Sequence, residues 1–357
     1  MTHLFSPLTL RGVTLRNRIA VSPMCEYSSE NGLANDWHLV HLGSRAVGGA
    51  GLVITEAAAV TAQGRISPQD LGLYDDAQIE PLQRITRFIQ DQGAHTGIQL
   101  AHAGRKASTT RPWEGHGAVS EDQGGWRPVV APSPLAFSDD SLVPKMLDQV
   151  GIAQIVAAFA RSAERSLAAG FDLIELHAAH GYLLHEFLSP LSNQRTDGYG
   201  GSFGGRTRIV REVVEAVRRV WPERLPLIVR ISATDWTEGG WDADESVKLA
   251  QVLKPLGVDM IDCSTGGNVP HAPIPVGPGY QVPFAERIKR EANIPTAAVG
   301  MISEPQQADG IIQSGQADLA LLALLARELL RDPYWPRRAA KALGQEITPP
   351  VQYGRAW

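Results

Sequence analysis

The stretch IELHAAHGYLLHEFLSPLSNQRTDGYGGS, residues 174–202, is the part of the chain that says most about its fold. It begins inside an apolar run, 171–176, which predicts a buried strand. His177, His180 and Tyr182 follow at the end of that strand, and a long polar loop comes after them. Folds built from parallel strands place their chemistry at the carboxyl ends of the strands. Because imidazoles can donate hydrogen bonds to a substrate oxygen and a phenol can deliver a proton, the stretch predicts an enzyme that polarises a carbonyl-like group and protonates an atom nearby.

The same alternation of short strand-like segments with helical patterns continues along the whole chain. Apolar residues at spacings of three and four indicate helices, as at 79–89 and 209–220. Several of the strand-like segments are almost wholly apolar, which is typical of parallel strands buried on both faces. The predicted strands are residues 18–23, 51–56, 96–100, 172–176, 227–231, 260–264, 296–299 and 318–322.

Eight strand–helix units in a chain of 357 residues favour a closed (β/α)8 barrel, the TIM barrel. The alternative is an open, doubly wound sheet. A chain of this length can bury one barrel-sized core, so we predict a single domain over residues 1–357.

Two segments depart from a minimal barrel. Residues 105–146, after the third predicted strand, show no clear periodicity but contain two tryptophans, so we predict an ordered capping loop over the barrel mouth. Residues 347–357 end in Tyr353, Arg355 and Trp357. Because aromatic side chains at a chain end are costly to leave in water, we predict that this C-terminal tail docks on another surface.

The composition excludes several classes of protein. A hydrophobic content of 43% and a charged content of 20% are ordinary for a soluble globular protein. The net charge of −5 gives no basic surface for nucleic acid, and no apolar run reaches membrane-spanning length. Only Cys25 and Cys263 are present, too few for a disulfide framework or a four-cysteine iron–sulfur cluster. We therefore expect a cytoplasmic protein that binds neither nucleic acid nor membrane.

Polar and small residues gather at the carboxyl ends of the predicted strands. Arg230 would be a fixed positive charge in an apolar barrel top and needs an anionic partner. The side-chain amide of Gln99 can pair with an edge that has both a donor and an acceptor. Gly300 and Arg327 follow the seventh and eighth predicted strands, at the usual phosphate site of a TIM barrel. A ligand with a phosphate at one end and an imide edge at the other suits these groups, and flavin mononucleotide (FMN) is such a ligand.

Other interpretations of single residues stay open at this point. His177, His180 and a cysteine could form a zinc site, although no third ligand stands at local spacing. Cys25 could be a small buried hydrophobic residue, which is common for a lone cysteine. The pair Gly200 and Gly201 is a poor phosphate motif, because no strand directly precedes it.

The residues also match a known family over nearly the whole chain. The chain resembles the old yellow enzyme family, and within it the thermophilic-like subclass of NADPH dehydrogenases and xenobiotic reductases. Besides residues 174–202, the resemblance rests on NRIAVSPMCEYSS (17–29), EAAAVTAQGRI (56–66), GIQLAHAGRKAS (97–108), VRISATDW (229–236), DCSTGG (262–267), AVGMI (298–302), ARELLRDPYW (326–335) and PVQYGRAW (350–357).

The resemblance implies a (β/α)8 barrel with non-covalent FMN over the carboxyl ends of its strands. It implies an NADPH:acceptor oxidoreductase, an ene-reductase that reduces the C=C bond of α,β-unsaturated carbonyl or nitro-type compounds by hydride transfer from FMN, with NADPH as hydride donor. His177 and His180 would bind the substrate carbonyl, Tyr182 would donate the proton and Tyr27 would line the pocket. The flavin would be held by Ser22, Pro23, Met24, Cys25, Ala57, Gln99, Arg230, Gly300, Ala326 and Arg327.

Two further implications concern tuning and assembly. A cysteine near the flavin, here Cys25, is a mark of the subclass and is thought to tune the flavin's potential. The arginine matching Arg355 reaches across a subunit interface into the neighbouring substrate pocket. The resemblance thus implies a homodimer or a tetramer whose active sites share Arg355.

One segment departs from the family pattern. Ala-Leu-Leu occurs twice in residues 320–325, and Ala326 stands where the family has glycine. Three extra residues would move Arg327 by about 10 Å if they were extended. We expect this duplication to weaken the grip on the FMN phosphate without abolishing the fold.

Two rival functions are compatible with a barrel. One is a flavin-free lyase or isomerase that uses the histidines as acid and base. The other is a flavin-binding sensor or scaffold whose chemistry is incidental.

Overall fold

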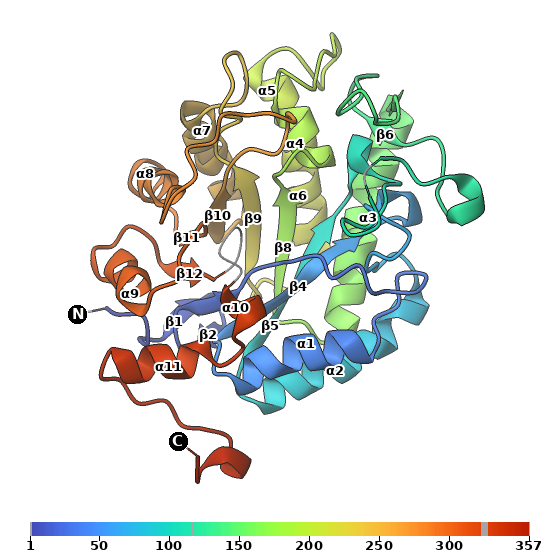
Figure 1. Ribbon diagram of the computed structural model, residues 1–357. Coiled ribbons are helices and arrows are strands. Elements are labelled where there is room, and N and C mark those ends of the chain that lie inside the picture. Colours follow the sequence, from blue (N-terminus) through green and yellow to red (C-terminus); the bar gives the residue numbers. More distant parts are fainter. Residues whose placement is uncertain (1, 116, 323–327, 357) are drawn as a thin grey trace.

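The computed structural model is a closed barrel of eight parallel strands with helices around it (Figure 1), and it describes residues 2–115, 117–322 and 328–356. The strands pair in the order β10-β11-β12-β3-β4-β5-β8-β9. The last barrel strand in the sequence, β12, thus closes the barrel against the first barrel strand, β3. The prediction of a TIM barrel is confirmed, and the open sheet is wrong. The barrel strands are β3 (Ile19–Val21), β4 (Leu52–Ala59), β5 (His95–Ala101), β8 (Leu173–Ala178), β9 (Leu227–Ser232), β10 (Met260–Ser264), β11 (Thr296–Ala298) and β12 (Leu319–Leu321).

The helices lie outside the strands and carry their apolar stripes inward. The two stripes used for prediction, at 79–89 and 209–220, are confirmed as α2 and α6. The α-helices are α1 (Asp36–Val47), α2 (Ile79–Asp91), α3 (Gln149–Ala168), α4 (Leu183–Leu188), α5 (Phe203–Arg206), α6 (Arg208–Val220), α7 (Ala243–Leu253), α8 (Val282–Ala292), α9 (Pro305–Gln313), α10 (Glu328–Arg331) and α11 (Trp335–Ala342). Short 3-10 helices are η1 (Ala62–Gly64), η2 (Asp76–Gln78), η3 (Gly104–Lys106), η4 (Glu121–Gln123), η5 (Lys254–Leu256) and η6 (Val351–Tyr353).

The main core lies between the barrel strands and this ring of helices. Ile209, Val213 and Val217 of α6 are all 0% exposed, and burying each such side chain contributes about 1.5–3 kcal/mol. The helix-to-strand turns allow this packing because a glycine ends the helix. After α3, for example, Gly170 has φ +83, a left-handed conformation that side chains with a Cβ rarely adopt.

The capping segment after β5 is ordered on the carboxyl side of the barrel. It contains a small parallel sheet of β6 (Val130–Ala131) and β7 (Lys145–Met146). The ring of Trp113 packs edge-on against Tyr27, with 5.7 Å between the ring centroids. Since Tyr27 follows β3, this contact links the cap to the carboxyl ends of the barrel strands.

A small antiparallel hairpin, β1 (Leu8–Leu10) and β2 (Val13–Leu15), precedes the barrel. In Figure 1 the C-terminal tail leaves α11 and runs away from the barrel. The Tyr353 ring lies 6.3 Å from the Tyr334 ring, whereas Val351 is 90% exposed and Arg355 is also exposed. The described tail therefore has one aromatic contact within its own chain and offers most of its surface outward.

Some predictions fall on residues that the structure does not describe. Residues 323–327 belong to this set, so the second Ala-Leu-Leu and the proposed FMN ligands Ala326 and Arg327 lie outside the described part, as does Trp357. Among the residues that are described, none of the helices combines the length and hydrophobicity that a membrane span requires.

Candidate functional site

His177 stands at the end of β8 with its ring orientation fixed by the backbone. Its Nδ1 accepts a hydrogen bond from the Ala179 N–H at 3.2 Å, so the proton of the neutral ring sits on Nε2. Burial, and next the positive charge of Arg230, hold the pKa of His177 well below its ordinary value. The ring is therefore neutral at pH 7, and its Nε2–H is a donor.

His180 is held by three polar contacts in a left-handed conformation, with φ +58. Its N–H donates to Ser232 Oγ at 2.9 Å, its carbonyl oxygen accepts from Lys106 Nζ at 2.8 Å, and its Nε2 lies 2.7 Å from Ser264 Oγ. Its ring is perpendicular to that of His177, with 5.1 Å between centroids. The Ser264 hydroxyl has one proton, and Gln281 Oε1 lies 3.3 Å from it as a second acceptor. When Ser264 donates to Nε2, the proton of the neutral ring sits on Nδ1 and the histidine pair presents two N–H donors; when Ser264 donates to Gln281, His180 Nε2 donates to Ser264.

Tyr182 lies beside this histidine pair. Its ring contacts that of His177 edge-on, with 5.0 Å between centroids. Burial raises the pKa of Tyr182 well above its ordinary value, so the phenol keeps its proton at neutral pH. Tyr182 is thus a protonated phenol next to the histidine pair.

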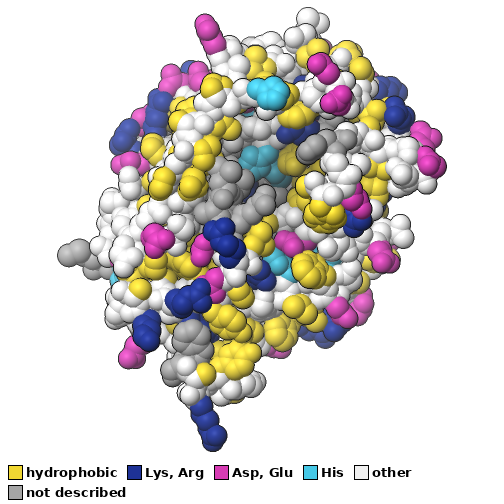
Figure 2. Space-filling model, viewed as in Figure 1, with side chains coloured by type: hydrophobic (Ala, Val, Ile, Leu, Met, Phe, Trp, Pro, Cys, Tyr) yellow, Lys and Arg dark blue, Asp and Glu magenta, His cyan; other side chains and the backbone are white. Residues whose placement is uncertain are grey.

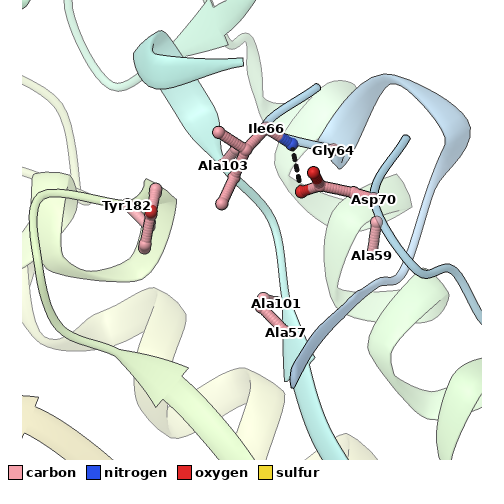
Figure 3. Close-up of a pocket in the computed structure, with 8 residues that line it drawn as sticks. All are labelled: Ala57, Ala59, Gly64, Ile66, Asp70, Ala101, Ala103 and Tyr182. Atoms are coloured by element: carbon pink, nitrogen blue, oxygen red, sulfur yellow. Dashed lines mark hydrogen bonds between the residues drawn. The ribbon is translucent and has the colours of Figure 1, made fainter. Parts of the chain in front are cut away.

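A small cavity lies between Tyr182 and the segment after β4 (Figure 3). Its volume is about 10 Å³, which is room for about one water molecule. Tyr182 and Asp70 face each other across it in Figure 3, and burial raises the pKa of Asp70 to about 7. The lining residues are Ala57, Ala59, Gly64, Ile66, Asp70, Ala101, Ala103 and Tyr182.

The segment after β3 forms another wall. Burial raises the pKa of the Cys25 thiol well above its ordinary value, so Cys25 is a thiol and not a thiolate. Tyr27, two residues further along, has φ +50. Among the described residues, no group of three or more His, Cys, Asp or Glu side chains gathers to hold a metal ion.

Charged groups occupy the interior of the barrel below the histidines. Arg230 is 1% exposed; its Nη1 donates to Ser22 Oγ at 3.0 Å and its Nε lies 3.1 Å from Asp262 Oδ2. Neither its Nε nor its Nη2 has a hydrogen-bond partner among the described residues, so the contact of Nε with Asp262 is an ion pair. Gln99 Nε2 donates to Glu175 Oε1 at 2.6 Å. The anionic partner expected for Arg230 is thus partly internal.

Gly300 follows β11 and packs closely against Tyr280 and Gln281. Its φ is +116, and a Cβ at this position would lie 2.8 Å from Gln281 Nε2 and 2.9 Å from a Tyr280 ring carbon. Gln281 is itself fixed, because its Nε2 donates to Val299 O at 3.0 Å and its Oε1 accepts from Thr265 Oγ1 at 2.7 Å. A side chain larger than hydrogen would disturb this network.

The structure brings most of the predicted residues to one end of the barrel. Figure 2 shows histidine side chains in the hollow on the face viewed there, with hydrophobic side chains around it. Arg355 is the exception, because it lies on the exposed tail and not at the barrel mouth of its own chain. The residues that follow or end barrel strands are Ser22, Pro23, Met24, Cys25, Tyr27, Ala57, Gln99, His177, His180, Tyr182, Arg230 and Gly300.

Four polar residues of this region were missed by sequence reasoning. Glu175 and Asp262 lie inside strands that read as apolar, and their inward direction follows only from the strand register. Lys106 is the last residue of the short 3-10 helix η3, and Gln281 precedes α8. For Glu175 and Asp262 the sequence held one signal, a charged residue inside an apolar strand. Such a residue is seldom buried unless it has a partner, so it points to a polar contact inside the barrel.

Known proteins resemble this chain along most of its length. The family model described as NADH:flavin oxidoreductase / NADH oxidase matches residues 3–346. The chain belongs to this family. The resemblance to the old yellow enzyme family is confirmed, and this family member is an oxidoreductase with FMN as its cofactor.

Individual members of the family align with the chain from end to end. A protein named NADPH dehydrogenase from Geobacillus sp. (strain WCH70) is 50% identical over 358 residues, covering 100% of this chain and 99% of that protein. NADPH dehydrogenase of Bacillus subtilis (strain 168) is 48% identical over 356 residues, covering 99% of each. A solved structure of morphinone reductase in complex with tetrahydroNAD has a TM-score of 0.78 and 25% identity, covering 99% of this chain and 94% of that one.

The barrel mouth fits the FMN that this family uses. The buried Nη2 of Arg230 has no hydrogen-bond acceptor among the described residues. A buried guanidinium suits an electron-rich ring edge or an anion. This agrees with a bound flavin.

Proposed function

We propose that this protein is an NADPH dehydrogenase that acts as an ene-reductase on α,β-unsaturated carbonyl or nitro-type compounds. The observation that carries the proposal is the placement of two neutral imidazoles, His177 and His180, beside the protonated phenol of Tyr182. The names of the relatives that are 50% and 48% identical support NADPH as the electron donor.

Each of the three side chains has a separate task. His177 and His180 donate hydrogen bonds to the carbonyl or nitro oxygen of the substrate. Negative charge grows on that oxygen as the alkene is reduced, so these donors stabilise the transition state more than the ground state. Tyr182 delivers the proton to the α-carbon. FMN, when bound, supplies the hydride that the β-carbon receives.

The remaining predicted ligands would hold the flavin around the barrel mouth. Arg230 and Gln99 would meet the polar edge of its ring system, and Gly300, Ala326 and Arg327 its phosphate. Ser22, Pro23, Met24, Cys25 and Ala57 would line its ring. Cys25, as a neutral thiol, would alter the polarity around the ring without forming a covalent bond.

We further infer an assembly with shared sites. Arg355 is exposed on a tail whose Tyr353 is only partly covered, so a second copy of the chain can receive it. In a homodimer or tetramer, this arginine would enter the neighbour's substrate pocket, which Tyr27 also lines. Cys25 and Cys263 are both unpaired, which agrees with a reducing cytoplasm.

The proposal is tested on the purified protein. We expect flavin absorbance bands, NADPH oxidation that accelerates on addition of an enone, a maleimide or a nitroester, and no acceleration with the matching saturated ketone. Running the same panel with NADH measures the preference between the two nicotinamides. A colourless protein that leaves NADPH unconsumed would contradict the proposal and favour a flavin-free lyase or isomerase, whereas flavin binding without enone reduction would favour a sensor.

A further inference from the structure

Two carboxyl side chains lie together inside the barrel, below the histidine pair. Glu175 is on β8 and Asp262 is on β10, and both are 0% exposed. The strand between them, β9, carries Arg230, which is directly opposite Asp262 in the register. Neither carboxyl is among the residues to which the proposed function gives a role.

The contacts of these carboxyls leave part of their hydrogen-bonding capacity unexplained. Glu175 Oε1 accepts from Gln99 Nε2 at 2.6 Å, and Asp262 Oδ2 lies 3.1 Å from Arg230 Nε. Glu175 Oε2 and both oxygens of Asp262 accept no hydrogen bond from an N–H or O–H donor among the described residues, so the 3.1 Å contact of Asp262 with Arg230 is an ion pair. The two carboxyl side chains nevertheless lie close enough to each other for a side-chain hydrogen bond, provided that one of them carries a proton.

A hydrogen bond between two carboxyls needs a proton on one of them. An ionised carboxylate is an acceptor only, so two ionised groups could not make this contact. Two like charges at hydrogen-bond distance in a buried site also repel each other strongly, and one of them then keeps its proton. Burial, the larger cause, and the neighbouring Asp262 both raise the pKa of Glu175 in agreement with this reasoning.

We propose that Glu175 and Asp262 share a single proton and act as one group with one negative charge. A second proton is excluded by Arg230, whose buried guanidinium 3.1 Å from Asp262 Oδ2 requires one anionic partner. The pair and Arg230 then sum to zero charge. His177 adds no charge, because its ring is neutral, and Gln99 is an amide.

This charge balance matters for the flavin if FMN lies over the barrel, and that part rests on the proposed function. Reduction adds negative charge to the flavin ring. With one shared proton, the carboxyl pair and Arg230 have a net charge of zero. They therefore do not repel the negative charge that reduction adds to the flavin ring. If both carboxyls were ionised, the net charge of −1 would disfavour reduction and lower the potential. Glu175 and Asp262 are therefore positioning residues, because their shared protonation sets the net charge of the barrel interior beneath the flavin ring.

The first test is infrared spectroscopy of the purified protein, whatever cofactor it carries. At about pH 9.5 ordinary buried acids have lost their protons, including Glu186 with its pKa of about 8 and Asp70 with about 7. We expect a carboxylic-acid C=O band to remain in the wild type. It should be absent from Glu175→Gln, and the difference spectrum cancels the bands of any bound flavin. No acid band in the wild type would overturn the proposal without any variant having to fold.

The second test measures the two-electron potential of the bound flavin at pH 7. In Glu175→Gln the amide can accept from Gln99 and donate to Asp262, so the site keeps its one negative charge and the potential should stay at the wild-type value. In the double variant Glu175→Gln/Asp262→Asn that charge is lost. We expect flavin reduction to become at least about tenfold more favourable, which is about 30 mV for a two-electron couple. Glu186→Gln, a buried acid on α4 outside the barrel, is the matched control and should leave the potential unchanged.

The two variants separate the possible protonation states. A higher potential in the single variant would mean that both carboxyls are ionised in the wild type. An unchanged potential in the double variant would mean that both carry protons. Either result overturns the shared proton. A protein that has the acid band but no flavin would instead refute the proposed function alone.

Discussion

Lys106 holds the backbone of His180, since its Nζ donates to the His180 carbonyl oxygen at 2.8 Å. The same ammonium group donates to Gly267 O at 2.5 Å, so it joins the loop after β8 to the loop after β10. It also lies 4.1 Å from the ring centroid of Phe137 in the cap and 5.4 Å from that of Tyr182. One side chain thus connects the cap, His180, which we propose binds the substrate, and Tyr182, the proposed proton donor.

Replacing Lys106 with methionine should misplace His180 while the barrel stays folded. A hydrogen bond from a charged group contributes about 1.5–3 kcal/mol, so kcat/KM for an enone should fall by about 10- to 100-fold. FMN retention should not change, because the contacts of the Lys106 ammonium group within the described chain are with His180, Gly267, Phe137 and Tyr182, none of which is a proposed flavin ligand. Lys145→Met, a change at an exposed lysine of the cap, is the control. Equal kcat/KM in the two variants would contradict the positioning role.

The pH dependence of activity should report the charge on Lys106. Burial, followed by the positive charge of Arg105, lowers the pKa of Lys106 to about 7, and Glu186 opposes this shift. As pH rises through about 7, the ammonium group loses its proton and its hydrogen bonds to His180 and Gly267 weaken. We expect kcat/KM to decline over this range in the wild type and this decline to be missing in Lys106→Met.

The contribution of Lys106 to the free energy of unfolding should rise with pH, whereas its contribution to kcat/KM should fall. Between about 7 and the ordinary value of 10.5, the unfolded chain binds more protons at Lys106 than the folded chain. The free energy of unfolding contributed by this lysine therefore rises with pH in that interval. Denaturant titrations of wild type and Lys106→Met between pH 6 and 9 check the sign. A wild-type protein that gains no stability relative to the variant would show that the lysine is not desolvated.

Tyr182→Phe should remove the proton donor and keep the pocket. The phenyl ring retains the edge contact with His177, which needs only the ring. Loss of a positioned general acid costs about 10²- to 10⁴-fold, so alkene reduction at saturating substrate should fall by that factor, with NADPH oxidation by the bound flavin unaffected. Stopped-flow measurement separates these two steps. Tyr74→Phe, which removes a hydroxyl bonded to Asn31 O outside the site, is the matched control. Full alkene reduction by Tyr182→Phe would exclude this role.

The barrel could be predicted because its strands are apolar and its helices have clear stripes. The strand ends were less certain. The strand predicted to end at Glu56 continues to Ala59. The three alanines at its end have no strand preference of their own, and they are extended because they pair with β5. The cap could not be predicted in detail, since its short strands β6 and β7 have no periodicity and depend on contacts with the rest of the fold.

The site was predictable only where chemistry stands next to a strand end. His177, His180 and Tyr182 follow β8 within a few residues, so their grouping follows from local sequence. Lys106 and His180 are 74 positions apart and meet only because their loops fold onto each other. The carboxyls of Glu175 and Asp262 were hidden for a related reason: the strand register decides whether a charge points into the barrel or toward the helices.

The C-terminal tail should matter to a neighbouring subunit and not to its own barrel. Arg355 is exposed, and within the described chain the tail's aromatic contact is that of Tyr353 with Tyr334. An exposed arginine that enters a partner's pocket would add binding energy for substrate without touching the flavin. Arg355→Gln should therefore raise KM more than it lowers kcat, and truncation before Gln352 should also weaken assembly in sedimentation experiments, with FMN retained in both. Lys341→Gln, at an exposed residue of α11, controls for loss of surface charge.

Mixing Arg355→Gln with an inactive Tyr182→Phe subunit gives the decisive measurement. A shared site predicts hybrids in which the Arg355→Gln subunit regains a low KM, because its pocket receives Arg355 from the Tyr182→Phe partner. A monomer whose KM ignores both the substitution and the mixing would rule out the shared site.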